Sequence, residues 1–225
     1  MANGNPTAPQ AGSHDVVDAA PRVTVVEMSE RLANPAPLGL AAFGLTTLAL
    51  NAFNAGLVDT SSEGLVWSLG IAFGGIAQFA AGMWEAKKNN TFGFTAFSAF
   101  GAFWVFLALV NIFTKTGAIA PVTPEGKSLF LVLWGIFAAY LTVVTFGISR
   151  ALQVVFVLLT ALFFGLAIGV HDAEGAFMHV VGWEGMLTAG AALYTSFAIL
   201  LQETWGREVL PLGIIQPKAS PAKSK

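Results

Sequence analysis

Residues 151–170 read ALQVVFVLLTALFFGLAIGV, and this stretch contains no charged side chain. An α-helix rises ~1.5 Å per residue, so about 20 apolar residues are enough to cross a hydrocarbon layer that is ~30 Å thick. A transmembrane β-strand would alternate polar and apolar residues, and this stretch does not alternate. It therefore predicts an α-helix that spans a membrane.

Five further segments have the same character, and the overall composition agrees with them. The 225-residue chain is 55% hydrophobic and 11% charged, whereas a soluble domain carries about 25% charged residues. The fourth and fifth segments are divided only by a short turn at 147–150, so they should form a tight antiparallel pair. We therefore expect an all-α membrane protein, a six-transmembrane-helix bundle with spans at 37–58, 64–84, 92–114, 128–149, 151–170 and 178–201.

The distribution of Lys and Arg predicts the orientation of this bundle. Only Lys115 and Lys127 fall on the side away from the termini, and the other nine basic residues fall on the side of the termini. The positive-inside rule then places both termini in the cytoplasm and the protein in the cell membrane. We expect a flexible cytoplasmic N-terminal tail over 1–33, a membrane transport domain over 34–205 and a cytoplasmic C-terminal tail over 206–225. The N-terminal tail lacks the apolar core of a secretory signal. The nine basic residues on the side of the termini are Arg22, Arg31, Lys87, Lys88, Arg150, Arg207, Lys218, Lys223 and Lys225.

The sequence argues against several other classes of protein. It has no cysteine, which excludes disulfides, thiolate metal sites and a cysteine nucleophile. A net charge of −2 without a long basic run argues against a nucleic-acid partner. No Gly-rich phosphate loop, nucleophile elbow or HExxH motif occurs, so we expect neither an enzyme nor a cofactor. His171, Asp172, Glu174 and His179 are close in sequence, but their spacing matches no zinc pattern, so we expect no metal.

Residues 34–40 read NPAPLGL and predict the start of the first helix. Proline is tolerated in the first turn, where its missing N–H would have had no intrahelical partner. Asn34 is a suitable N-cap, because its side-chain oxygen can accept a hydrogen bond from a free N–H of that turn. The positive end of the helix dipole would then face a vestibule and attract anions, although the motif could also serve only to fix the entry of the helix.

The polar residues inside the spans are almost all neutral. Lys, Arg, Asp and His are absent from the centres of the six segments, and Glu85 and Glu184 lie within about two turns of a segment end. A charge-pairing proton pump or a retinal protein would need intramembrane ionisable groups, so both are disfavoured.

Several of these neutral residues are spaced so that they share a helix face. The spacing places Phe43, Thr47, Asn51 and Asn54 along one face of the first helix. Gln78 shares a face with Glu85, and Phe100 shares one with Asn111. Such faces either line a path for a solute or join helices together.

Three ordered blocks of the sequence resemble the acetate uptake transporter family, which includes the bacterial succinate–acetate permeases. The blocks are NPAPLGL with the following FGLTT (43–47), GGIAQ (74–78) with AGMWE (81–85), and NTFGFTAF (90–97) with GAFW (101–104). Weaker matches follow at 133–135, 150–153, 167–169 and 206–211, so the resemblance covers about 34–213.

The resemblance implies a six-helix protomer related in fold to the proton-gated urea channels, with cytoplasmic termini and a pore in each protomer of a homo-hexameric ring. It also implies a narrow hydrophobic constriction at Phe43, Phe100 and Leu159. The family carries a Tyr at the position of Phe100, and the missing hydroxyl bears on the choice between acetate and succinate.

The leading interpretation is a permease or channel in the lipid bilayer for acetate, and for succinate or other small carboxylates, with a proton as a second partner. An apolar ring flanked by neutral hydrogen-bonding groups suits a small carboxylate that must lose water to pass. The alternatives are a channel for small neutral solutes such as urea or ammonia, and a membrane sensor without transport. The expected substrate-binding and pore residues are Asn34, Phe43, Thr47, Asn51, Gln78, Phe100 and Leu159.

Overall fold

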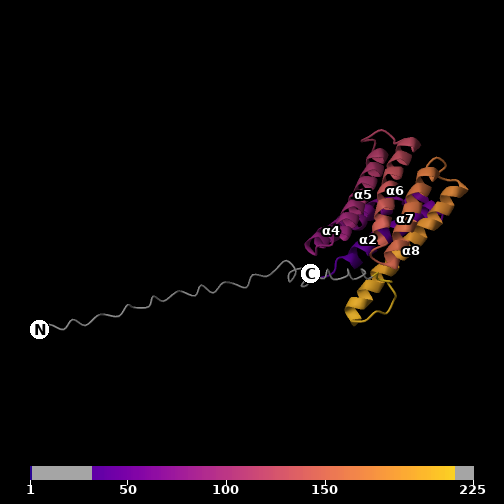
Figure 1. Cartoon of the computed structure of the whole chain (residues 1–225). Coiled ribbons are helices and arrows are strands. Elements are labelled where there is room, and N and C mark those ends of the chain that lie inside the picture. Colours follow the sequence, from indigo (N-terminus) through magenta and orange to yellow (C-terminus); the bar gives the residue numbers. More distant parts are fainter. Residues whose placement is uncertain (2–31, 216–225) are drawn as a thin grey trace, which may run out of the picture. The chain divides into compact units, whose positions relative to one another are not determined.

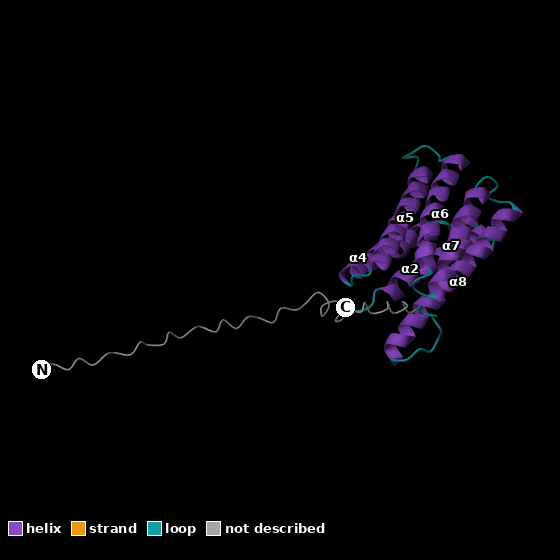
Figure 2. Ribbon diagram, viewed as in Figure 1, coloured by secondary structure: helices purple, strands orange, loops and turns teal. Residues whose placement is uncertain are grey.

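The computed structural model of the protein describes Met1 and residues 32–215, and the account below concerns residues 32–215. Most of these residues are helical and short loops join the helices (Figures 1 and 2). Six stretches are long and apolar enough to cross a membrane, which confirms the expected all-α six-span bundle. Most of the predicted N-terminal tail and residues 216–225 lie outside the described residues. The spans are α2 (Ala36–Asn54), a composite second span (Thr60–Lys87), α5 (Thr91–Thr116), α6 (Pro124–Thr145), α7 (Arg150–Gly169) and α8 (Ala176–Trp205).

Polar side chains fix the starts of these helices. Asn90, Thr123 and Ser149 each accept a hydrogen bond from a backbone N–H three residues later, at the starts of α5, α6 and α7. At the start of α2 the expected cap is wrong by one residue. The N-cap position is Pro35, whose carbonyl accepts the first intrahelical hydrogen bond, from the Gly39 N–H at 3.0 Å. The Asn34 side-chain oxygen still accepts a hydrogen bond from the Ala36 N–H at 3.0 Å.

The second span contains a feature that the hydrophobic pattern did not predict. It consists of η1 (Thr60–Ser62), α3 (Gly64–Leu69), a π-helix η2 (Gly70–Ala77) and α4 (Gln78–Lys87). The π-helix contains Gly70, Gly74 and Gly75, and glycine weakens the α-helical preference of this stretch. A Cβ atom on Gly74 would lie 2.7 Å from the Thr46 hydroxyl, so the absence of a side chain at Gly74 allows α2 to approach closely.

The six spans close into a ring. The first and last spans, α2 and α8, pack against each other along their length, and α7 lies between α8 and α6. A Cβ atom on Gly182 of α8 would overlap the backbone of Asn54 and Ala55 of α2. Between α6 and α7, the Thr142 hydroxyl donates to the Phe156 carbonyl at 2.9 Å, and these two helices form the expected close pair.

Residues that follow α8 return to the turn between α6 and α7. The N–H groups of Arg150 and Ala151 donate to the carbonyls of Gly213 and Leu212 at 2.9 and 3.0 Å, and the Ile215 N–H donates to the Ile148 carbonyl at 2.9 Å. Gly213 has a φ of +60°, which an L-residue rarely adopts. We call residues 206–215 the C-terminal strap.

The close approach of α2 and α8 predicts that one glycine of α8 is much less replaceable than another. Gly182→Leu should lower the free energy of unfolding by about 1–3 kcal/mol, because the new side chain would push the two backbones apart. Gly190→Leu is the matched control, since a Cβ atom at Gly190 meets nothing within 4 Å. Thermal unfolding of both variants in detergent measures the difference, and equal shifts would contradict this account of the α2–α8 contact.

Candidate functional site

The centre of the bundle is an aromatic cluster around Phe100 of α5. Phe100 is 2% exposed, and its ring lies within 6.3 Å of five other rings, centroid to centroid. Large aromatic side chains therefore fill the space between helices, as they also do where Phe103 stacks on Phe130 of α6 at 5.7 Å. The five partners of Phe100 are Phe43 of α2, Trp134 and Phe137 of α6, and Phe156 and Phe163 of α7.

The structure brings the three expected constriction residues into one buried apolar cluster. Phe43, Phe100 and Leu159 are 6%, 2% and 2% exposed, and they come from α2, α5 and α7. The centroids of the Phe43 and Phe100 rings are 6.0 Å apart. The three residues therefore occupy a position where they could close a path along the bundle axis, and their role as a constriction stays a prediction.

Three buried oxygens of neutral side chains on α2 and the second span lack hydrogen-bond partners within residues 32–215. They are the hydroxyls of Thr46 and Thr47 and Oε1 of Gln78, and all three residues are at most 3% exposed. An unpaired buried polar group costs about 1–3 kcal/mol. The expected site residues Thr47 and Gln78 are therefore available to bind a solute or water.

Asn51 has a different environment. Its amide donates to the Thr47 carbonyl at 2.9 Å and its oxygen accepts from the Asn54 amide at 3.1 Å. A Cβ atom on Gly185 of α8 would overlap the Asn51 side chain. Asn51 thus lies at the contact between α2 and α8, and its place beside a lumen stays a prediction.

Asn34 joins the start of α2 to the end of α8. Its amide donates to a carboxylate oxygen of Glu203 at 2.6 Å. Nearby, the Ser196 hydroxyl donates to the Pro37 carbonyl at 2.6 Å. Asn34 is half-buried at one mouth of the bundle, and its expected role in binding the substrate stays a prediction.

A polar hollow of about 450 Å³ lies at the opposite mouth, between the loop after α2 and the loop before α8. Its lining includes Asn54, Asp59, Glu174 and His179. Hydrogen bonds from Ser61 lower the pKa of the Asp59 carboxyl, so this group stays charged at mildly acid pH. Asn54 joins the hollow to Asn51, and the polar face of α2 therefore begins at a solvent-facing site.

Two carboxylates lie deeper in the structure than the sequence indicated. Glu85 is 2% exposed, and its Oε2 accepts a hydrogen bond from the Asn90 amide at 2.8 Å. Glu184 lies eight residues into α8, about 12 Å from its start at ~1.5 Å per residue. It accepts a hydrogen bond from the Thr188 hydroxyl at 3.0 Å.

The sequence reasoning also missed Phe156 and Phe163, which complete the aromatic cluster. Both lie on the face of α7 that carries Leu159, at spacings of three and four residues. The helical period could therefore have identified them.

The fold and the site define a multi-pass helical membrane protein whose interior is aromatic and mostly neutral. The chain belongs to the GPR1/FUN34/yaaH family, which matches residues 18–211. It is 42% identical to the succinate-acetate/proton symporter SatP of Escherichia coli over 183 residues, covering 81% of this chain and 96% of that protein.

Two further similarities agree. Acetate permease A of Emericella nidulans is 33% identical over 201 residues, which cover 82% of this chain and 67% of the permease. The solved structure of the bacterial acetate channel SatP superposes with a TM-score of 0.78 and 42% identity, covering 81% of this chain and all of that one. These relatives are named as transporters and channels and none of them as an enzyme.

The environment of Glu85 predicts that Asn90 does more than cap α5. Asn90→Ala removes the N-cap, which should lower the free energy of unfolding by about 1 kcal/mol. It also leaves the buried Glu85 carboxylate without its amide partner, which should lower it by a further ~1–3 kcal/mol. Thr123→Ala is the matched control, because it removes an exposed cap of α6 and leaves no buried carboxylate without a partner. Thermal unfolding compares the two variants. An equal loss of stability would show that the contact with Glu85 contributes nothing.

Proposed function

We propose that the protein is a permease for acetate and other small carboxylates, succinate among them, and that a proton accompanies the substrate. The observation that carries the proposal is that Phe43, Phe100 and Leu159 from three helices share one buried cluster, which we propose as the neck of the pore. Neutral hydrogen-bonding groups flank this neck instead of charged ones. Membership of the family and the names of the relatives support acetate as the substrate class.

The chemistry of the neck favours passage of the carboxylate without its charge. An ion loses several kcal/mol of hydration free energy in an apolar ring unless a partner compensates the charge. Protonation of the substrate removes that cost. The protonated acid has one O–H donor and one carbonyl acceptor, which match the Gln78 oxygen and the Thr47 hydroxyl. We therefore propose that Thr47 and Gln78 bind the substrate beside the neck, and that Asn34 and Asn51 line its approach.

The arrangement of charge supports cytoplasmic termini. Lys87, Lys88 and Arg150 lie at one end of the bundle, and at the other end Lys115 is neutralised by Glu63 at 2.6 Å. The chain has no cysteine, so a single introduced cysteine can report on which side of the membrane it lies. In intact cells a membrane-impermeant maleimide should label Lys127→Cys and spare Lys87→Cys. The reverse labelling pattern would show that the termini are on the outer side of the membrane.

The homo-hexameric ring that the resemblance implies belongs to the same proposal. Native mass spectrometry of the purified protein tests this oligomeric state.

The neck predicts two changes of transport in liposomes loaded with the purified protein. Leu159→Ala should raise acetate uptake and admit succinate more readily, because the smaller side chain lets water into the constriction. Phe100→Tyr should change the ratio of acetate to succinate uptake because it adds a hydroxyl while nearly keeping the ring volume, and it should cost at most about 1–3 kcal/mol of stability. Uptake of labelled acetate, succinate, urea and ammonia measures both effects. If the wild-type protein takes up urea or ammonia but no acetate, the result would instead support the neutral-solute channel. If it takes up none of these solutes, the result would support a sensor.

The control for Leu159→Ala is Leu141→Ala in α6, which is 3% exposed against 2% for Leu159. Both truncations should lower the free energy of unfolding by about 2–5 kcal/mol. Only Leu159→Ala should alter selectivity. If both variants keep the wild-type ratio of acetate to succinate uptake, Leu159 belongs to the packed core and does not form the neck.

Passage of the protonated acid predicts a pH dependence that belongs to the substrate. Uptake should rise as pH falls toward the pKa of the acid, because the neutral fraction of the substrate grows. Glu85→Gln and Glu184→Gln should both keep this pH profile. If either variant transports acetate at a rate independent of pH, that carboxylate carries the proton and the proposed mode of proton linkage is wrong.

A further inference from the structure

A groove of about 450 Å³ runs along the outer surface between the second span and α5, away from the aromatic neck. Small residues open it: Ala80 of α4 faces Gly101 and Ala102 of α5. Gly101 must be small, because a Cβ atom there would lie 2.7 Å from the Phe79 backbone. Bulky side chains flank these residues, with Ile76 62% exposed. The groove is thus apolar and open to the outside along its length. It lies on the part of the surface that would face the acyl chains of the lipid bilayer.

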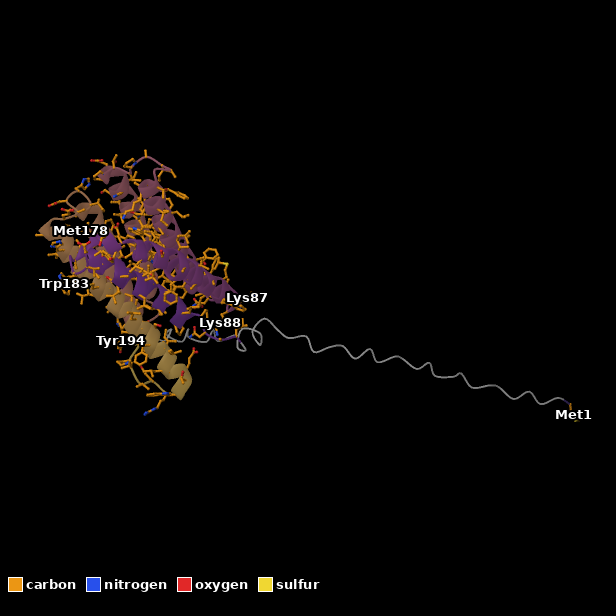
Figure 3. All side chains as sticks on the ribbon, turned by 180° about the vertical axis from the view of Figure 1, so that it is seen from behind. Met1, Lys87, Lys88, Met178, Trp183 and Tyr194 are labelled. Carbon is orange, nitrogen blue, oxygen red and sulfur yellow. The ribbon has the colours of Figure 1, made fainter. Side chains whose placement is uncertain are left out.

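One end of the groove carries an aromatic ring and a cation. Trp84 lines the groove, and the Lys87 Nζ lies 4.7 Å from the centroid of its ring. Lys87 is the last residue of the second span, so this pair lies at the depth where Trp and Lys anchor helices to lipid headgroups. Figure 3 shows Lys87 and Lys88 at one end of the bundle and Met178 at the other.

Within residues 32–215, Lys87 forms no ion pair, and the carboxylates at its end of the bundle are engaged elsewhere. Glu85 is buried and accepts a hydrogen bond from Asn90. Glu203 accepts one from Asn34, and Glu208 accepts one from the Leu212 N–H. The cation is therefore placed for an anion from outside residues 32–215.

We propose that this groove binds an anionic phospholipid, with one acyl chain between the second span and α5 and the phosphate at Lys87. The two parts of the site match the two parts of the ligand. Burial of methylene groups in the groove favours any phospholipid. The charge of Lys87, held over Trp84, favours a headgroup with net negative charge over a zwitterionic one.

A second copy of the chain fits the same groove less well. A protein partner would have to supply an anion beside Lys87, and the described carboxylates at this end are already bonded within the protomer. A lipid brings its own phosphate. The occupancy of the groove by a neighbouring protomer is therefore the competing outcome of the test.

The test uses the purified full-length protein, stripped of lipid in detergent and titrated with phosphatidylglycerol or phosphatidylcholine, with binding followed by native mass spectrometry. The wild type should bind phosphatidylglycerol more tightly. Lys87→Gln should reduce this preference about five-fold, as expected for one basic side chain near anionic lipid. Lys127→Gln, at the other end of the bundle, should leave it unchanged.

A second variant tests the groove itself. Ala102→Phe places a ring in the groove from an exposed position and should reduce the affinity for both lipids. If it proves poorly folded, Ala102→Leu serves the same purpose with less bulk. Equal affinity of the wild type for the two lipids, or lipid binding untouched by Lys87→Gln and by filling the groove, would overturn the proposal. The proposal would also be overturned if filling the groove dissociated an oligomer while lipid binding remained. That result would show that the groove is a contact between protomers.

Discussion

The close approach of α2 and α8 is the constraint on which the rest of the bundle depends. Backbone groups in hydrocarbon must be satisfied within the protein, so a membrane fold of separate helices gains its stability from how closely they pack. Gly182 and Gly185 let the last helix lie on the backbone of the first and on Asn51. This contact turns a linear series of helices into a closed ring with an interior of its own.

The interior of that ring is filled in an uneven way. On the α2–α8 side the helices meet through glycines, whereas α5 and α6 meet through the rings of Phe103, Phe130 and Trp134. Small residues bring backbones together, and aromatic rings hold them apart without leaving a void. The aromatic cluster around Phe100 thus lies on the side where rings, and not glycines, separate the helices.

The sequence predicted those features that depend on a single helix. The six spans followed from length and hydropathy, and Asn34 was correctly expected to bind an N–H of the first turn, although the cap position itself is Pro35. The π-helix was not predictable from periodicity, because the uniformly apolar pattern of residues 70–77 does not distinguish a π-helix from an α-helix. The meeting of Phe43, Phe100 and Leu159 is likewise a property of three helices together. Only the family resemblance could supply it in advance.

The C-terminal strap has a consequence for the order in which the fold can be completed during synthesis. The first N–H groups of an α-helix lack partners within the helix, and for Arg150 and Ala151 of α7 the partners are the carbonyls of Gly213 and Leu212. Those carbonyls leave the ribosome only after α8 has been made. The α6–α7 hairpin must therefore enter the membrane with the start of α7 unfinished, and it acquires its last hydrogen bonds only when the following helix is in place.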